Sequence, residues 1–290
     1  MNTRITKGER VFYIVNYFLI ALIVLVTLYP FIYVVSASFS DPYAVVRGEV
    51  ILIPKGLNIN AYKEVFKSTE LWLSYRNTLW YVVVGTFVNV FMTTIMAYPL
   101  SRKGFSGRNV VNFFVAFTMF FTSPLVPTFL VVKSVGLMNS MWALVIPTAI
   151  DAFYLIIMRS FFEQLPDSVL EAAKIDGCNE IQVLFKIVIR LSGPVMAVMV
   201  LFYAVYHWNS YFSALLYLND EHKYPLQMIL RKILLTVGGT ANGQVSDRKD
   251  LISMSVRYAT IIVSTVPILC VYPFLQKYFV KGIMIGAVKE

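Results

Sequence analysis

Charged residues are scarce in this sequence: only 14% of its 290 residues are Asp, Glu, Lys or Arg, whereas 58% are hydrophobic. A soluble domain of ordinary composition carries about 25% charged residues, so this shortage excludes a soluble globular protein. Acidic residues are the scarcer sign, 16 against 25 basic residues, for a formal net charge of +9. The basic residues stand at the ends of apolar runs and form no dense block, which favours a bilayer-flanking role over nucleic-acid binding.

Cysteine and histidine are also rare, with two of each. Cys178 and Cys270 match neither a disulfide framework nor metal-ligand spacing, and His207 and His222 show no metal spacing. No G-x-x-x-x-G-K-[ST] motif occurs, so the chain has no P-loop to hold a nucleotide. HExxH, G-x-S-x-G and a pair of intramembrane carboxylates are lacking too, which argues against a membrane-embedded hydrolase. We expect no metal or cofactor to be bound by this chain.

Long hydrophobic runs, in contrast, are abundant. A transmembrane helix needs about 20 apolar residues, and six runs reach that length: 12–36, 78–100, 110–132, 141–160, 194–218 and 256–276. The first run is too long to be the apolar part of a cleaved secretion signal. The sequence therefore predicts an all-α polytopic membrane protein with six transmembrane helices, forming a single transmembrane domain over residues 1–290.

Basic residues in the short segments predict the orientation of these helices. Three of them precede the first run, and Arg102, Lys103 and Arg108 lie between the second and third runs. Cytoplasmic loops are enriched in Lys and Arg, so both segments are expected on the cytoplasmic side, together with both termini. Long loops at 37–77 and 219–255 are then outside, and a loop at about 163–193 is inside.

The loop at 163–193 contains the pattern of a short helix with a defined start and stop. Ser168 and Glu171 have the spacing of a capping box, which would begin the helix. Gly177 tolerates the left-handed conformation that ends one. On these features alone, an ordinary cytoplasmic loop is as good an interpretation as a docking element.

Two apolar patterns in this loop predict a contact face on the short helix and a second helix after it. One places small or apolar side chains on one face of the short helix, where another protein could approach closely: Val169, Ala172 and Ala173. The other repeats at helical spacing on the way to Pro194 and the fifth run: Ile181, Leu184, Phe185 and Val188. The loop is therefore predicted to be a helix, a turn and a second helix.

The run Glu171-Ala172-Ala173-Lys174-Ile175-Asp176-Gly177, with Ile187 and Pro194 downstream, resembles the EAA loop of ABC-importer permeases. Further segments resemble the carbohydrate-uptake permeases of the maltose-transporter type: Trp208-Asn209, Tyr217 to Asp220, and Tyr272 to Lys289. More narrowly, they resemble the Gram-positive branch associated with polysaccharides or lipoproteins. One departure is Arg190, where the family pattern usually has proline.

This resemblance implies a type I ABC-importer permease fold and the import of a carbohydrate, with an oligosaccharide favoured, through a bacterial plasma membrane. It implies a second homologous permease in a heterodimer, an extracellular substrate-binding lipoprotein, and two ATPase subunits that use ATP and Mg. The implied ATPase-coupling residues are Glu171, Ala172, Ala173, Asp176 and Gly177, and the tail after Lys277 would lie near the ATPases. A self-sufficient secondary transporter is the nearer alternative, and an enzyme acting on lipid-linked sugars is the more distant one.

Candidate substrate-pathway residues lie in the fourth and fifth runs. Asp151 falls inside the fourth run, where a charge is costly unless it is paired or faces water. It could contact sugar hydroxyls or, with equal weight, make a structural hydrogen bond. The other candidates are Tyr203, Trp208, Asn209 and Tyr211, in a cluster that also has the composition of an interfacial aromatic belt. Asn89, inside the second run, is more typical of a hydrogen bond between helices.

Overall fold

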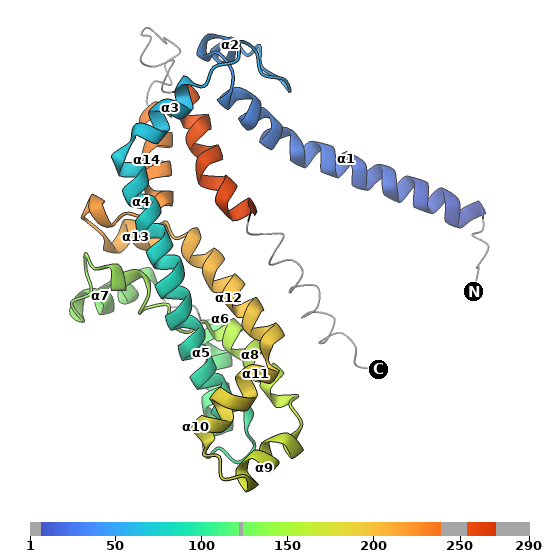
Figure 1. Cartoon of the computed structure of the whole chain (residues 1–290), viewed down its shortest axis with the longest axis vertical. Coiled ribbons are helices and arrows are strands. Elements are labelled where there is room, and N and C mark those ends of the chain that lie inside the picture. The colour runs from blue at the N-terminus through green and yellow to red at the C-terminus, as the bar shows by residue number, and fades with distance from the viewer. Residues whose placement is uncertain (1–6, 122–123, 239–253, 271–290) are drawn as a thin grey trace. The chain divides into compact units, whose positions relative to one another are not determined.

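A computed structural model describes residues 7–121, 124–238 and 254–270 (Figure 1). Every regular element in these ranges is a helix, as predicted for an all-α protein. The chain divides into two compact units, residues 1–69 with 230–265 and residues 70–229 with 266–290. The C-terminal pattern from Tyr272, the tail after Lys277 and the end of the sixth apolar run lie outside the described residues.

The first unit begins with α1, Lys7–Ser38. Its apolar side chains are exposed along most of its length. A helix that is hydrophobic on every face requires apolar surroundings, and from Gly8 onwards this one is long and apolar enough to cross a membrane. The first predicted span therefore forms a helix of the expected kind.

Short helices pack against the end of α1 in the same unit. They are α2, Pro42–Val46, and α3, Asn60–Lys67. Ala37 of α1 is buried with Val45 of α2. The hydroxyl groups of Ser38 and Tyr62 are 2.8 Å apart, which joins α1 to α3. The helix Met254–Cys270 contributes Tyr258, whose ring meets Tyr33 edge to face.

The second unit is a helical bundle in which α5 packs against both α8 and α12. Its elements are α4 (Thr69–Trp80), η1 (Tyr81–Gly85), α5 (Thr86–Ser101), α6 (Arg108–Phe120), α7 (Leu125–Ser134), η2 (Met141–Leu144), α8 (Ala152–Glu163), α9 (Asp167–Ile175), α10 (Glu180–Val183), η3 (Leu184–Val188), α11 (Ile189–Leu191), α12 (Gly193–Trp208), α13 (Phe212–Tyr217), η4 (Glu221–Lys223) and α14 (Leu226–Gly238). The first residue of α4 and most of α14 belong to the first unit. Here η1 and η3 are π turns, and η2 and η4 are 3-10 turns.

The predicted spans do not all form unbroken helices. Among the described residues, Gly8–Ser38 and Thr69–Ser101 are continuous helices long enough to cross a membrane, and two bent pairs are long enough together. The run 141–160 was expected to be one helix, and this is wrong. The side chains of Ser140 and Asp151 accept hydrogen bonds from backbone N–H groups and so begin two separate helices, η2 and α8. The count of six spans stays a prediction.

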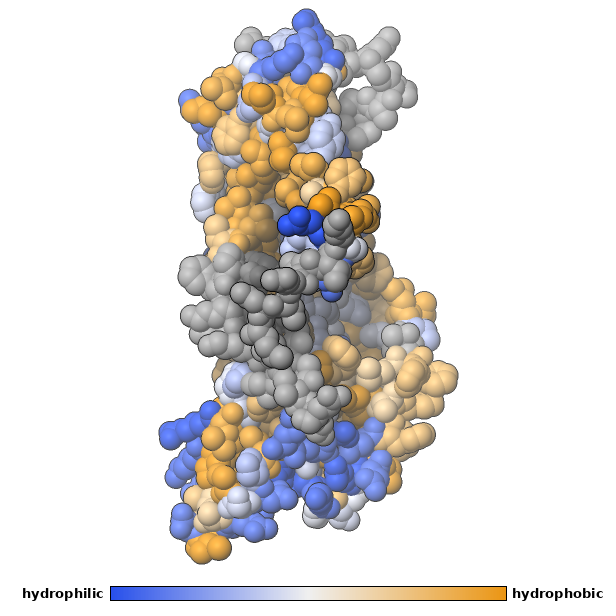
Figure 2. All heavy atoms as spheres, turned by 90° about the vertical axis from the view of Figure 1, so that its right-hand side faces the viewer, coloured by the Kyte–Doolittle hydropathy of each residue, from blue (hydrophilic) through white to orange (hydrophobic). Residues whose placement is uncertain are grey.

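The hydrophobic core of the second unit continues from the bundle into α9 and α10. Buried side chains from α5, α8, α9, α10, η3 and α12 form one cluster, which includes Tyr98, Phe162, Leu170, Ala173, Val183 and Met199. Hydrophilic side chains gather at the lower end of Figure 2, over α9 and α10. The segment predicted as a cytoplasmic loop is thus a polar end of the bundle that shares the bundle's core.

Candidate functional site

The start of α9 differs from the prediction. The helix begins at Asp167 after Pro166, and no side chain caps it, so the predicted capping box of Ser168 and Glu171 is wrong. The Asp167 carboxylate lies in the first turn, where its negative charge is attracted to the positive end of the helix dipole. It is also 3.8 Å from Nη1 of Arg102. The helix therefore begins with a proline and an acidic first turn, and not with a serine cap.

The end of α9 is as predicted. Gly177 has a φ of +83°, in the left-handed region. Its N–H donates to the carbonyl oxygen of Lys174 at 3.0 Å, and the N–H of Cys178 donates to that of Ala173 at 3.0 Å. These two bonds form a Schellman motif, which satisfies carbonyl groups that a helix end leaves open. The prediction that Gly177 stops the helix is confirmed.

The orientation of α9 changes which residues a partner could reach. Leu170 and Ala173 are buried in the core cluster, each 5% exposed. The prediction that Ala173 belongs to the contact surface is therefore wrong, because the larger Leu170 draws that side of the helix inward. Five exposed residues of α9 and its C-terminal cap are here called the α9 outer face: Val169, Glu171, Ala172, Ile175 and Asp176. Asp167, Ser168 and Lys174 are exposed as well.

The second helix of the loop begins with a capping box that the sequence analysis missed. Oδ1 of Asn179 accepts from the N–H of Gln182 at 2.8 Å, and Oε1 of Gln182 accepts from the N–H of Asn179 at 3.0 Å. The spacing of Asn and Gln in the sequence obeys the same rule that was applied to Ser168. The signal was therefore available.

The rest of that helix runs through the π turn η3 into α11. Of the four residues in the apolar pattern, Leu184 and Val188 are buried, but Ile181 is 69% exposed and Phe185 44% exposed. The π turn adds a residue to the helical repeat and so shifts the buried face. Arg190 continues the helix, and the chain bends by 86° only between Leu191 and Gly193. The missing proline at Arg190 therefore does not interrupt this segment.

A polar cluster ties α9 and α10 to the last turn of α5. Nζ of Lys174 is 2.5 Å from Oε1 of Glu180, and the hydroxyl of Tyr98 donates to Oε2 of Glu180 at 2.7 Å. These donors, Lys174 first, hold the pKa of the Glu180 carboxyl below its ordinary value. The guanidinium of Arg102 lies over the Tyr98 ring at 5.7 Å. It also donates to the carbonyl oxygen of Phe162 at the end of α8.

The sequence suggested that Asp151 is a charge inside a transmembrane helix, and this is wrong. It is exposed at the N-terminus of α8, where Oδ1 accepts from the N–H of Tyr154 at 3.0 Å. The backbone N–H groups and the dipole of α8 stabilise its charge there. Contact between Asp151 and a sugar stays a prediction.

The other candidate substrate residues separate into buried and open positions. Tyr203 is 2% exposed, and its hydroxyl is 2.7 Å from that of Thr93 and accepts from the N–H of Asp151 at 3.2 Å. Trp208 is 8% exposed and packs inside the unit. Both side chains are therefore part of the packed interior of the second unit. Asn209 and Tyr211, in contrast, line a cavity.

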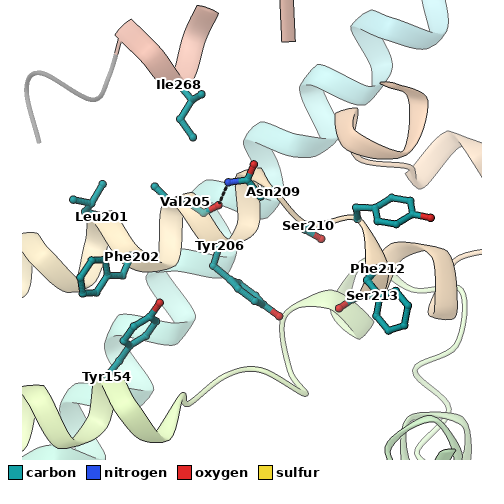
Figure 3. Close-up of a pocket in the computed structure, with 11 residues that line it drawn as sticks. Tyr154, Leu201, Phe202, Val205, Tyr206, Asn209, Ser210, Phe212, Ser213 and Ile268 are labelled. Atoms are coloured by element: carbon teal, nitrogen blue, oxygen red, sulfur yellow. Dashed lines mark hydrogen bonds between the residues drawn. The ribbon is translucent and has the colours of Figure 1, made fainter. Parts of the chain in front are cut away.

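This cavity lies within the second unit and has a volume of about 780 Å³ (Figure 3). Its walls are Tyr154, Leu201, Phe202, Val205, Tyr206, Asn209, Ser210, Tyr211, Phe212, Ser213 and Ile268. None of these residues is charged. Nδ2 of Asn209 donates to the carbonyl oxygen of Val205 at 2.8 Å. Cavities of about 300–1,000 Å³ accommodate small-molecule ligands, so the volume of this space is in the range of a ligand site.

Two aromatic wall residues, Tyr154 and Phe202, were not predicted from the sequence, whereas Tyr206 belongs to the aromatic cluster already noted around Trp208. The rings of Tyr154 and Phe202 stack with centroids 5.1 Å apart, although they come from α8 and α12. Tyr206 follows Phe202 by one helical turn on α12 (Figure 3). Helical spacing links Phe202 with Tyr206, but no sequence signal places Tyr154 beside them.

An all-helical bundle with a capped helical loop at one polar end and an uncharged cavity in the bundle has the features of a transporter membrane subunit. Residues 71–285 match the family described as the binding-protein-dependent transport system inner membrane component. The chain belongs to this family, whose members are permease subunits of ABC transporters rather than enzymes.

Curated relatives and a solved structure agree with this membership. The chain is 44% identical to the polygalacturonan/rhamnogalacturonan transport system permease protein YtcP of Bacillus subtilis, covering 97% of this chain and 99% of that protein. It is 44% identical to the protein LplC of the same organism, covering 98% and 97%. A crystal structure of a bacterial ABC transporter that imports the acidic polysaccharide alginate matches with a TM-score of 0.88 and 36% identity. That match covers 96% of this chain and all of the other.

Proposed function

We propose that this chain is one of two membrane subunits of an ATP-driven importer that moves an oligosaccharide across the plasma membrane by alternating access. A second homologous permease, two ATPase subunits and an extracellular binding protein complete the assembly. Two similar proteins support the substrate class, since one is named for the transport of polygalacturonan or rhamnogalacturonan and the other is described as importing alginate. Six transmembrane helices with both termini in the cytoplasm are part of the proposal.

The observation that carries the coupling role is the α9 outer face. α9 is a short helix stopped by Gly177, and it presents Glu171, Ala172 and the 86% exposed Ile175 away from the bundle core. An exposed isoleucine with Glu171 one turn before it and Asp176 directly after it suits a partner surface that has an apolar hollow beside a basic residue. Lys174, its other neighbour, pairs with Glu180. An ATPase with such a surface would take up α9, with Glu171 facing a basic residue.

Alternating access follows from this contact by a shift between two conformations. ATP binding brings the two ATPases together, and the α9 helices of the two permeases move with them. The conformation that opens outward then becomes the more stable one, and hydrolysis restores the inward-open conformation. The binding energy of ATP, and not this chain, supplies the driving force.

The cavity walls support a sugar-binding role on chemical grounds. Aromatic faces such as Tyr206 stack on the C–H faces of sugar rings, and amide groups such as Asn209 bond to hydroxyls. We propose that Tyr206, Asn209 and Tyr211 contact the passing oligosaccharide. No charged residue stands among the cavity walls in the described part of the chain, so we propose that the second permease meets the carboxylates of an acidic sugar.

The test uses the full complex reconstituted in proteoliposomes. Glu171→Lys reverses the charge of the α9 outer face, and we expect it to abolish ATPase stimulation by the sugar-loaded binding protein. The matched control is Glu64→Lys, because Glu64 is an exposed glutamate on α3. Normal stimulation in the Glu171 variant would overturn the coupling role. Sugar uptake by this chain alone, without any ATPase, would favour a secondary transporter instead.

A further inference from the structure

The helix α9 is tied to the bundle at both ends by polar contacts that meet on the last turn of α5. At its start, Asp167 is 3.8 Å from Nη1 of Arg102. At its end, Lys174 pairs with Glu180, and Glu180 in turn accepts from the hydroxyl of Tyr98. Arg102 lies over the ring of Tyr98, so the contacts from the two ends of α9 meet at the end of α5. The contacts form a closed circuit around α9.

These contacts contribute little to holding the fold together. The side chains of Lys174 and Glu180 are 50% and 59% exposed, and an exposed ion pair adds almost nothing to stability. The packing of Leu170 and Ala173 already fixes α9 to the core. Apolar packing is non-directional, however, whereas a hydrogen bond to a carboxylate has a defined length and direction. The circuit therefore suits the transmission of a movement better than the maintenance of the fold.

Tyr98 is the member that connects this circuit to the interior. Its side chain is only 6% exposed, and it belongs to the core cluster that runs into α8 and α12. Its hydroxyl nevertheless reaches Glu180, the first residue of α10. This hydrogen bond therefore connects α10 directly to α5, which packs against both α8 and α12.

We propose that Glu180 and Tyr98 are the positioning residues through which movement of α9 is transmitted to α5 during transport. This inference rests on the proposed function, because it assumes that an ATPase engages the α9 outer face. It adds a second step inside the permease: the partner moves α9, and the bond between Glu180 and Tyr98 makes α5 follow.

The test separates docking from transmission. Tyr98→Phe removes only the hydroxyl, and Glu180→Gln removes only the charge of a side chain of the same size. Two matched controls remove equivalent groups in the first unit: Tyr62→Phe, whose hydroxyl meets Ser38 at 2.8 Å, and Glu64→Gln, whose carboxylate pairs with Lys67 at 2.9 Å. Each complex is purified, its ATPase content is measured, and sugar import and ATP hydrolysis are recorded in the same proteoliposomes.

For both test variants we expect normal ATPase content, because the α9 outer face is unchanged. Sugar imported per ATP hydrolysed should fall about tenfold, the effect of losing one charge-assisted hydrogen bond from the moving state. The double variant should be no worse than the more impaired single variant, since Glu180→Gln removes the charge from the acceptor of the same hydrogen bond whose donor Tyr98→Phe removes. The two controls should keep the ratio of the unmodified complex.

Several results would overturn this inference. An unchanged ratio of sugar to ATP in either test variant would show that the link carries no movement. Loss of ATPase from the purified complex would show that the two residues only support the docking surface. If the unmodified chain purified without any ATPase, the proposed function itself would fail, and that result is distinct from the other two.

Discussion

Nε2 of His207 lies 2.7 Å from Oδ1 of Asn89, and this contact joins α12 to α5 inside the second unit. Both side chains are fully buried. Nδ2 of Asn89 faces the carbonyl oxygen of Thr148, which can only accept a hydrogen bond, so Oδ1 is the amide atom that faces the imidazole. Nε2 of His207 therefore carries the proton. The expectation that Asn89 forms a hydrogen bond between helices is confirmed.

Replacing Asn89 should destabilise the complex. Asn89→Leu keeps a similar volume but leaves the His207 N–H and the Thr148 carbonyl without their partner, at a cost of about 1–3 kcal/mol each. We expect a lower Tm for the purified complex, measured by thermal unfolding in detergent. Asn109→Leu, at an exposed position on α6, is the control. Equal Tm values for the two variants would contradict this account of the buried pair.

Gly85 makes room for the His207 ring. A Cβ atom on Gly85 would lie 2.4 Å from Nε2 and within 2.8 Å of three ring atoms. Because His207 is fully buried and held by Asn89, Gly85→Ala should destabilise the protein by about 1–3 kcal/mol through overpacking. Gly104→Ala is the control, since a Cβ there meets nothing within 4 Å.

A double-mutant cycle tests the cause of that loss. His207→Ala removes the ring that the new methyl group would strike, so Gly85→Ala should cost less in that background than in the natural protein. Thermal unfolding of the four variants gives the coupling. Strictly additive losses would mean that the strain at Gly85 arises from something other than His207.

The left-handed conformation of Gly177 should matter for coupling beyond its effect on stability. Gly177→Ala forces an L-residue into that region at a cost of about 1–2 kcal/mol. Gly136→Ala is a close control, because Gly136 also has a positive φ, +75°, and open space around it. We expect similar falls in Tm for both but a fall in sugar-stimulated ATPase activity only for Gly177→Ala. Equal activities would remove Gly177 from the coupling residues.

Cysteine labelling tests the predicted orientation of the chain. In a variant without Cys178 and Cys270, Lys63→Cys should react with a membrane-impermeant maleimide added to whole cells. Lys103→Cys should react only after the membrane is opened, because its loop is predicted to be cytoplasmic. Both lysines are exposed, so access of the reagent is not limited by the protein itself. Labelling of Lys103→Cys in intact cells would contradict the six-span topology.

The cavity predicts a specific effect on transport. Tyr206→Ala removes an aromatic wall that we propose stacks on sugar rings, worth about 0.5–1.5 kcal/mol, so import should fall by roughly two- to twelvefold. The complex should still assemble with its ATPases. Tyr43→Ala is the control, since Tyr43 has a similar exposure, 49% against 41% for Tyr206, and lies in the first unit. Unchanged import by the Tyr206 variant would argue against this cavity as the sugar path.

The local sequence was enough to predict the membrane class of this protein, the end of α9 and the family. Apolar composition determines that the chain is a membrane protein, since its long apolar segments, such as α1, form helices that bury little of their own surface. Gly177 stops α9 because a positive φ is a local property of the backbone. The EAA-like segment and the family it indicates depend on residue identity alone, and the family is confirmed.

Other features depended on the tertiary structure because they arise between segments distant in sequence. Nothing local indicates that Leu170 turns Ala173 inward, or that Asp151 caps a helix rather than lying within one. The bond from Tyr98 to Glu180 joins residues 82 positions apart. The cavity likewise needs Tyr154 of α8 beside Phe202 of α12. Spacing along a helix specifies which residues share a face, whereas only the packing of helices decides what that face meets.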